Sequence, residues 1–306
     1  MLRRTLVTTM AGLAAGGAAA ATRPTTTATT TPARARASRA GVVETGDATL
    51  HVRDWGAGRP VVFLSAWGFS SDAWQYQMGP LSQQGLRCVT YDRRGHGRSS
   101  DPGRGYDFDT LADDLADVLA AMDLRDAVLV GYSMGSGEAV RYLSRHGRGR
   151  VSRLLLLAPT TPFLPRAADN PDGVDPAVFA AGRAGMASDF PAALEAGFGR
   201  FIEHGASEPL KAWAKSLMLQ CSLQALIDCQ KAFSQTDFRP DVRRLDLPVL
   251  VIHGDADQSA PLALTSAKTV ALAPGAQLKV YAGAPHGLVF THTAQLNADI
   301  AAFAKT

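Results

Sequence analysis

A serine, an aspartate and a histidine, in that order along the chain, are the side chains whose types and positions could do chemistry. Ser133 lies between Gly131 and Gly135 directly after an apolar run, and Asp257 and His286 each follow a later apolar run. A serine hydroxyl is a poor nucleophile at neutral pH unless a histidine takes its proton and a carboxylate orients that histidine. The three residue types therefore indicate attack by an activated serine on an acyl carbon.

The stretch around Ser133 predicts a sharp turn from a strand into a helix. Apolar residues 128–130 end at Gly131, and a helical pattern runs over 138–143. Small flanking residues let a strand and a helix approach closely, so that the hydroxyl is exposed above the sheet and beside the N–H groups of a helix N-terminus. The G-x-S-x-G pattern alone is common by chance, and its context supports the catalytic interpretation.

Two aspartates on one loop are candidates for the carboxylate. Asp255 and Asp257 both follow the apolar stretch 248–252. We favour Asp257, because it is further from the end of the expected strand and can reach over the sheet. Asp255 is better suited to tie down its own turn, as short acidic side chains commonly do.

Among the seven histidines, His286 is the candidate base. It stands alone in a turn rich in Gly and Pro, after the apolar stretch 277–281. The other six are expected on the surfaces of a hairpin or of helices (His51, His146, His204 and His292) or in loops, where they bond locally (His96 and His253).

Segments with strand and helix patterns alternate along most of the chain. Continuous apolar runs predict buried strands, at 60–64, 88–91, 127–130, 154–157, 248–252 and 277–281. Helices are expected between and after them, at 72–84, 106–124, 133–146, 263–273 and 292–304. With an antiparallel hairpin around Gly46 at one edge, this order predicts an α/β fold, with a doubly wound and mostly parallel sheet.

The alternation stops between about 159 and 247, where helical stretches predict an inserted cap. These stretches cover 175–187, 190–202, 209–220 and 222–236. A cap of this kind is best placed over the carboxyl ends of the strands, where ligands bind. It brings seven bulky aromatic residues, Phe163, Phe179, Phe190, Phe198, Phe201, Trp213 and Phe233. If several converge above Ser133, the space left for an acyl group is small.

Composition and charge indicate one globular domain over residues 41–306. The chain has 306 residues, of which 46% are hydrophobic and 19% charged. Residues 1–40 hold six arginines and no acid, so removing these six from the 31 basic residues leaves 25 against 28 acidic residues. The domain therefore has no basic field that would favour a nucleic acid or an anionic membrane as a partner.

Cysteines and glycines give no sign of a disulfide framework, a metal or a cofactor. Cys88, Cys221 and Cys229 are too few for a framework, and we expect buried thiols. If Cys221 and Cys229 share a helix, their spacing of eight residues puts them about 12 Å apart, beyond disulfide reach. The histidines and cysteines lack paired ligand spacing. The Gly95-His96-Gly97 stretch lacks the third glycine of a phosphate loop.

The first 40 residues have the layout of a signal peptide and a linker. Residues 1–21 combine Arg3 and Arg4 with a run rich in Ala and Gly, and they resemble a twin-arginine signal, which predicts export to the periplasm or the medium. Residues 22–40 consist of Thr, Ala, Arg, Pro and Ser, and are expected to be a disordered linker. The alternative is a start codon downstream and a cytoplasmic protein.

From Gly41 to Ala304 the sequence resembles a known family, the α/β-hydrolases grouped as cofactor-free haloperoxidases, bacterial aryl esterases and perhydrolases. The resemblance rests on five motifs, D-R-R-G-H-G-R-S at 92–99, G-Y-S-M-G at 131–135, T-D-F-R-P-D at 236–241, H-G-D-A-D-Q at 253–258 and A-P-H-G at 284–287. It implies that Ser133 is the nucleophile, His286 the base and Asp257 the acid, in the chain order of α/β-hydrolases.

The resemblance also implies an oxyanion hole made by the backbone N–H groups of Trp67 and Met134. The family commonly has His-Gly before that tryptophan, where this chain has Ser65-Ala66. An oxyanion hole needs only the N–H, so the departure concerns the backbone path of the loop.

The sequence thus predicts a serine carboxylic-ester hydrolase for small esters that uses no metal or cofactor. The acyl-enzyme would be released by water. Two alternatives stay open, a perhydrolase or haloperoxidase in which hydrogen peroxide replaces water, and a ligand receptor built on a hydrolase fold.

Overall fold

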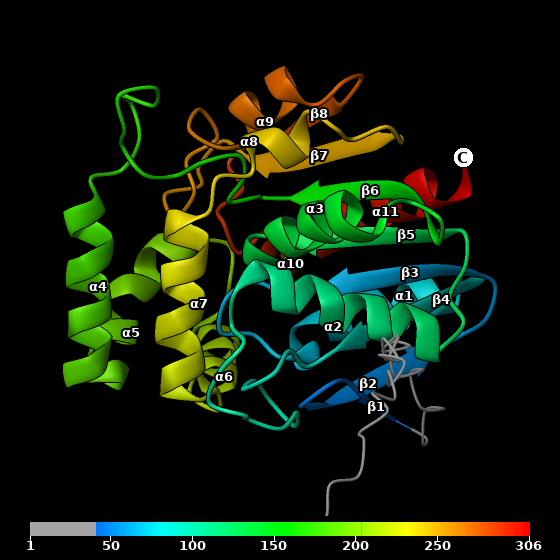
Figure 1. Ribbon diagram of the computed structural model, residues 1–306, viewed down its shortest axis with the longest axis horizontal. Coiled ribbons are helices and arrows are strands. Elements are labelled where there is room, and N and C mark those ends of the chain that lie inside the picture. Colours follow the sequence, from blue (N-terminus) through cyan, green and yellow to red (C-terminus); the bar gives the residue numbers. More distant parts are fainter. Residues whose placement is uncertain (1–40, 203) are drawn as a thin grey trace, which may run out of the picture. The chain divides into compact units, whose positions relative to one another are not determined.

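A twisted sheet of eight strands crosses the part of the chain that the structure describes, residues 41–202 and 204–306 of a computed structural model (Figure 1). The sheet order is β1-β2-β4-β3-β5-β6-β7-β8. The strands are β1 (Val42–Glu44), β2 (Thr49–Trp55), β3 (Arg59–Leu64), β4 (Leu86–Tyr91), β5 (Ala127–Tyr132), β6 (Val151–Leu157), β7 (Val249–Gly254) and β8 (Gln277–Tyr281). The predicted signal peptide and linker lie outside the described residues.

All pairs from β4 to β8 are parallel, and β1 and β2 form the antiparallel hairpin at one edge. The central strands are buried on both faces, as their continuous apolar runs require. Side chains alternate between two cores, so that Val62 and Leu64 join one and Val61 and Phe63 join the other. The predicted α/β fold is confirmed.

Helices cover both faces of the sheet. α2 (Phe108–Ala121), α3 (Met134–His146) and α9 (Ser266–Leu272) pack on one face, and α1 (Gln75–Ser82), α10 (Leu288–Thr291) and α11 (Thr293–Lys305) on the other (Figure 1). The helix expected at 72–84 begins as a 3₁₀ turn, η1 (Ser71–Trp74). The helix expected from 263 starts only at Ser266, because residues 261–265 form tight turns.

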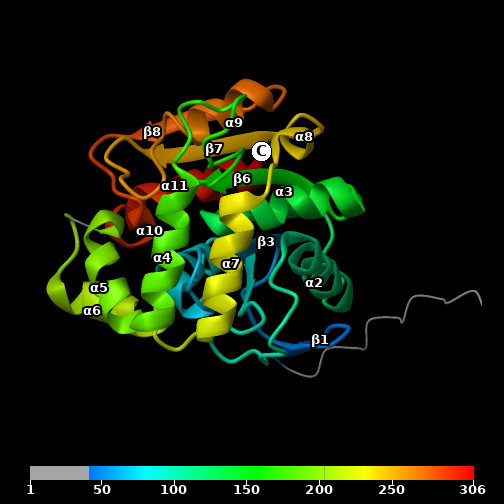
Figure 2. The same cartoon turned by 60° about the vertical axis from the view of Figure 1, so that its left-hand side comes forward.

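Between β6 and β7 the described residues form a loop, 158–175, and five helices, of which four stand beyond the carboxyl ends of the strands (Figure 2). They are α4 (Pro176–Ser188), α5 (Phe190–Phe201), α6 (Glu208–Met218) and α7 (Leu223–Gln235). Asp175, Asp189, Ser207 and Ser222 each cap one of them by accepting a backbone N–H. The short α8 (Arg239–Val242) leads back to the sheet, where it contacts α3 and α9.

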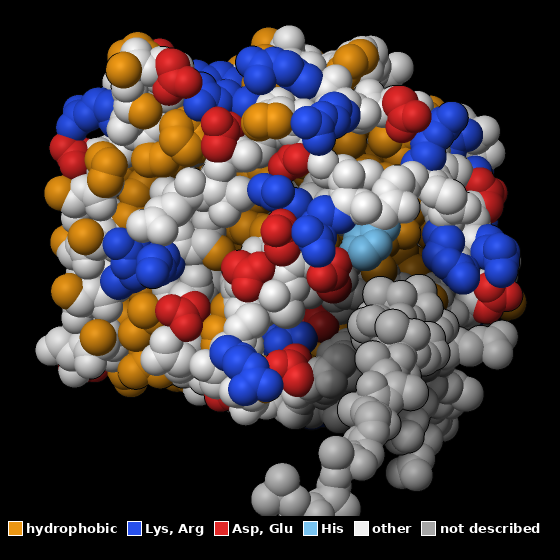
Figure 3. Space-filling model, viewed as in Figure 1, with side chains coloured by type: hydrophobic (Ala, Val, Ile, Leu, Met, Phe, Trp, Pro, Cys, Tyr) orange, Lys and Arg blue, Asp and Glu red, His pale blue; other side chains and the backbone are white. Residues whose placement is uncertain are grey.

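The three cysteines are buried free thiols. Cys221 lies in the turn before α7 and Cys229 within that helix, so the two do not share one helix. No helix in the described ranges is both long and apolar enough to cross a membrane. On the face seen in Figure 3, basic and acidic side chains are interspersed.

The first turn of α3 packs directly against the end of β3. A Cβ atom on Gly135 would lie 2.4 Å from the carbonyl oxygen of Leu64, closer than any real contact. Only glycine therefore fits at this position without moving the helix or the strand.

We expect Gly135→Ala to lower the free energy of unfolding by about 1–3 kcal/mol, because the added methyl group must push α3 away from β3. Urea denaturation measures the change. Gly149→Ala is the matched control, since nothing lies within 4 Å of its added Cβ, and it should change stability by less than about 0.5 kcal/mol. Equal stability of the two variants would contradict the close packing.

Candidate active site

Ser133 occupies a strained turn between β5 and α3. Its φ of 53° and ψ of −116° lie in a region that residues other than glycine rarely adopt. The turn is held by the Ser133 N–H, which donates to the Leu157 carbonyl at 2.8 Å, and by the Ser133 carbonyl, which accepts from the Ser136 N–H at 3.0 Å. Gly131 is required as well, because a Cβ there would lie 2.7 Å from the Gly135 carbonyl oxygen.

His286 reaches Ser133 from the turn after β8. Its Nε2 lies 2.9 Å from the Ser133 hydroxyl oxygen, and the ring is buried. The Tyr132 hydroxyl donates to the His286 carbonyl at 2.8 Å, and the Gly287 N–H donates to the carbonyl of Phe201 in the cap at 2.8 Å. The backbone on both sides of the histidine is therefore fixed, once by the residue next to the serine and once by the cap.

Asp257 completes the chain of hydrogen bonds. Its Oδ2 lies 2.6 Å from Nδ1 of His286, and its Oδ1 accepts the N–H groups of Ser259 and Ala260, both at 2.8 Å. Asp255 is exposed and instead accepts the N–H of Gly283 at 2.6 Å. The structure brings Asp257 to His286, whereas Asp255 links the loop after β7 to the loop after β8.

A second histidine, His253, also lies against Asp257. It is the fifth residue of β7, fully buried, and not a loop residue as expected. Its Nε2 is 3.0 Å from Oδ2 of Asp257, off the ideal hydrogen-bond angle, and its Nδ1 is 2.6 Å from the Ser266 hydroxyl. The spacing of four residues in H-G-D-A-D is the sequence signal that could have suggested this pair.

The Asp257 carboxylate stays ionised in spite of its burial. Burial opposes ionisation, but the nearby His286 and His253 imidazoles outweigh it and hold the pKa of Asp257 well below that of an ordinary aspartate. A permanent negative charge at this place favours the imidazolium form of His286, which a proton transfer from Ser133 would create.

Met134 directly follows Ser133 in the chain, and Trp67 lines the same pocket as the serine. Met134 is the first residue of α3, so its N–H has no acceptor within the helix. Trp67 follows β3, and neither backbone N–H donates to a protein acceptor in the described part of the chain. The Trp67 indole N–H donates to the carbonyl of Leu226 in α7 at 2.8 Å. The fold therefore leaves both N–H groups free to donate to a ligand.

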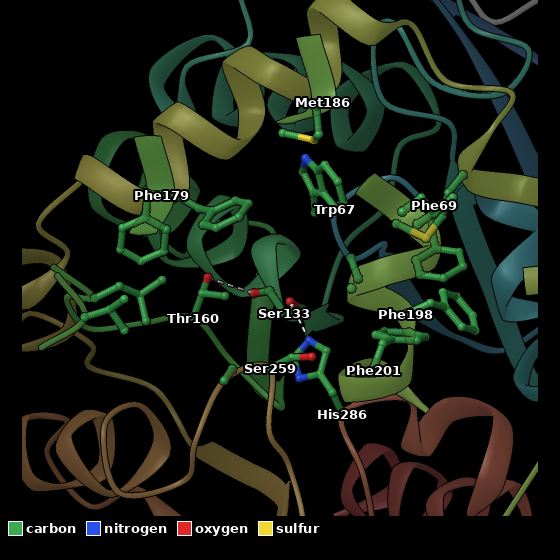
Figure 4. A pocket seen from close by; sticks show the side chains of 18 of the residues that line it. Trp67, Phe69, Ser133, Thr160, Phe179, Met186, Phe198, Phe201, Ser259 and His286 are labelled. Carbon is green, nitrogen blue, oxygen red and sulfur yellow. Dashed lines mark hydrogen bonds between the residues drawn. The ribbon is translucent and has the colours of Figure 1, made fainter. Parts of the chain in front are cut away.

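A pocket of about 240 Å³ opens onto Ser133 and His286 (Figure 4). Thr160 and Ser259 add hydroxyl groups on the side of the serine, and sequence reasoning did not identify either. The rest of the wall is almost entirely apolar. It includes five of the seven cap aromatics, Phe179, Phe190, Phe198, Phe201 and Phe233.

The other two aromatic residues of the cap do not line the pocket. The Arg239 guanidinium carbon lies 4.6 Å from the centroid of the Phe163 ring. Trp213 packs edge-on against Tyr76 and Phe290. Both find partners outside the cavity, so of the seven cap aromatics only the other five contribute to the pocket wall.

No group of three or more His, Cys, Asp or Glu side chains that could hold a metal ion occurs among the residues that the structure describes. The two imidazoles around Asp257 face that carboxylate on one side and a serine hydroxyl on the other, Ser133 for His286 and Ser266 for His253. The site therefore consists of a serine, two imidazoles, one carboxylate and the apolar pocket.

The mostly parallel sheet and the chain order Ser133, Asp257, His286 are typical of α/β-hydrolases. A family model described as alpha/beta hydrolase fold matches residues 59–293. The chain belongs to the α/β-hydrolase family. It is 41% identical over 284 residues to a non-heme chloroperoxidase from Streptomyces lividans, which covers 87% of this chain and 100% of that protein. It is 36% identical over 280 residues to a bifunctional esterase/perhydrolase from Acinetobacter calcoaceticus, with 87% and 100% covered.

Among solved structures, an esterase from Exiguobacterium antarcticum superposes with a TM-score of 0.84 at 28% identity, over 87% of this chain and 99% of that one. These relatives confirm the predicted resemblance to cofactor-free haloperoxidases, esterases and perhydrolases. This protein is a hydrolase of that group.

Proposed function

We propose that this protein is a serine carboxylic-ester hydrolase that acts on small esters. The observation that carries the proposal is the unbroken chain from the Ser133 hydroxyl to His286, 2.9 Å, and from His286 to Asp257, 2.6 Å, at the floor of an apolar pocket. The esterase and the esterase/perhydrolase among its relatives support the same reaction class.

In the proposed reaction, the Ser133 oxygen attacks the ester carbonyl carbon while His286 takes the hydroxyl proton. The N–H groups of Met134 and Trp67 hold the negative oxygen that forms. His286 then gives its proton to the leaving alcohol, and the C–O bond to the alcohol breaks. Water, deprotonated by His286, attacks the acyl-enzyme, and the acid leaves as Ser133 regains its proton.

Perhydrolysis is a second candidate, favoured by the names of two of the relatives, a chloroperoxidase and an esterase/perhydrolase. Hydrogen peroxide would replace water as the nucleophile toward the acyl-enzyme, and the product would be a peracid, which can oxidise halide. The apolar wall of the pocket supports this path, because a small nucleophile better than water competes well where water is scarce.

Replacing the nucleophile gives the first test. We expect Ser133→Ala to lower the turnover of p-nitrophenyl acetate by about 10⁴-fold or more with the fold intact, and to abolish labelling by a fluorophosphonate probe. Ser144→Ala, further along α3, is the control and should keep both activity and labelling. Labelling of the Ser133→Ala variant would refute the nucleophile, and binding of esters by the parent without turnover would indicate a receptor.

The two aspartates are separated by matched substitutions. Asp257→Asn should reduce kcat by about 10⁴-fold, because an amide at the orienting position favours the wrong imidazole tautomer, as in a serine protease. Asp255→Asn should reduce kcat by less than about tenfold, since the Asp255 carboxylate accepts the N–H of Gly283 and does not bond to His286. Steady-state kinetics with p-nitrophenyl acetate decide the matter, and the assignment is reversed if Asp255→Asn is the more damaging change.

Chain length and nucleophile are tested in one series. We expect kcat/KM to be highest for acetyl to butyryl esters, because each further methylene gains only about 0.8 kcal/mol and a clash with packed aromatic side chains costs more. Peracid should form from acetate esters at millimolar peroxide, with hydrolysis still dominant. Octanoyl esters as the best substrates would refute a small pocket, and undetectable peracid would remove the perhydrolase candidate.

Paired phenylalanine variants control for the pocket. Phe198→Ala, in the pocket wall, should shift the optimum towards longer chains, whereas Phe163→Ala, outside it, should leave the optimum unchanged. Equal shifts in both variants would mean that the pocket does not set the chain length.

A further inference from the structure

One buried guanidinium contacts both elements that carry the oxyanion-hole amides. Arg93 Nη2 donates to the Ser65 carbonyl at 2.9 Å, two residues before Trp67. Its Nε and Nη2 donate to the same carboxylate oxygen of Glu138, at 2.9 and 2.7 Å. Glu138 lies on α3, four residues after Met134, about one helical turn.

The topology explains why this position can reach both elements. Arg93 follows β4, which pairs with β3, and β3 in turn pairs with β5. The loop 65–67 leaves the carboxyl end of β3, and α3 leaves that of β5. The long Arg93 side chain, just after the end of β4, can therefore reach both the loop that follows β3 and the helix that follows β5.

Because both groups are buried, the ion pair of Arg93 and Glu138 should contribute little net stability. The Arg93 and Glu138 side chains are 3% and 0% exposed, and Arg93 Nη1 has no partner among the described residues. The desolvation of two charges cancels much of the free energy of their attraction, and a buried N–H without an acceptor lowers the free energy of unfolding further. Tyr91 donates to the second oxygen of Glu138, and burial and that carboxylate raise its pKa, so the phenol keeps its proton.

The neighbouring Arg94 shows what a structural ion pair in the same loop looks like. It is equally buried, and it donates to both oxygens of Asp114 on α2 at 2.7 Å and to Asp47 of the hairpin turn at 2.9 Å. None of these partners belongs to the loop 65–67 or to α3. Unlike Arg93, Arg94 has a partner for each of its three guanidinium nitrogens, and it contacts neither the loop 65–67 nor α3 through these bonds.

We propose that Arg93 is a positioning residue for the oxyanion hole, which holds the loop of Trp67 and the helix of Met134 in register through the Ser65 carbonyl and Glu138. The inference rests on the proposed ester hydrolysis. Two N–H donors stabilise the oxyanion only at about 2.7–3.1 Å, so a small shift between loop and helix weakens the transition state more than the bound ester. Arg93 should therefore act on kcat and little on KM.

The test compares two matched double variants in full-length protein. Arg93→Met with Glu138→Gln removes both charges together, so that no uncompensated buried ion is left. We expect kcat for p-nitrophenyl acetate to fall about 10- to 100-fold, with KM changed by less than about threefold. The inhibition constant of phenylboronic acid, whose adduct with a serine places an anionic oxygen in the hole, should rise by a similar factor. The fraction of enzyme labelled by a fluorophosphonate at completion should match the parent.

Arg94→Met with Asp114→Asn is the control and should lower the melting temperature without changing kcat or boronate affinity. Equal losses of kcat in both double variants, or parental kcat and boronate affinity in the Arg93 variant, would overturn the inference. If the double variant does not fold, Arg93→Lys decides in the same assays, because one ammonium compensates Glu138 but lacks the planar fork that reaches Ser65 as well. Parental kcat in Arg93→Lys would also overturn it.

These outcomes separate the inference from the proposed function. An inactive parent that no fluorophosphonate labels would overturn both. An active parent with an unaffected Arg93 variant would overturn only the role of Arg93.

Discussion

The whole site depends on how closely α3 approaches β3 and β5. Gly131 and Gly135 leave no room for a side chain, and the single residue that connects strand to helix is forced to a positive φ. That residue is Ser133, so the same packing presents its hydroxyl to the pocket and places the first N–H of α3 next to it. Backbone strain of this kind persists only where the surroundings fix it, and here two sheet strands and a helix do so.

Around this turn, hydrogen bonds and two imidazoles hold one carboxylate in place and favour its ionised form. Both oxygens of Asp257 are occupied, one by two backbone N–H groups and the other by two imidazoles within 3.0 Å. Its pKa is lower in the folded protein than in the unfolded chain. Its contribution to stability is therefore present above the ordinary aspartate pKa, about 3.9, and is lost as the pH falls through the lower folded value.

Sequence patterns were enough to predict the strands of the sheet and which side chains follow each strand, because continuous apolar runs and strand ends are local features. The loop after β7 shows where local patterns stop: the partners of Asp255 and Asp257, the Gly283 N–H and the His286 ring, come from the distant loop after β8. His253 was misplaced for the same reason, since its neighbour is set by the path of β7. Which cap aromatics face the pocket depends on the rotation of the helices and on the path of the loop after β6, where Phe163 packs against Arg239.

The cap provides much of the pocket wall and the strand ends carry Ser133 and His286, but the two parts contact each other. Helices α4 and α5 supply eight of the residues that line the pocket. The start of α7 and the turn before it contact the loop that carries Trp67, because Leu226 accepts the Trp67 indole N–H and the Cys221 thiol donates to the Gly68 carbonyl. Changes in α4 and α5 should therefore alter which ester fits. Changes near the start of α7 also act on the loop of Trp67, for which we propose an oxyanion role, so they should alter how fast any ester reacts.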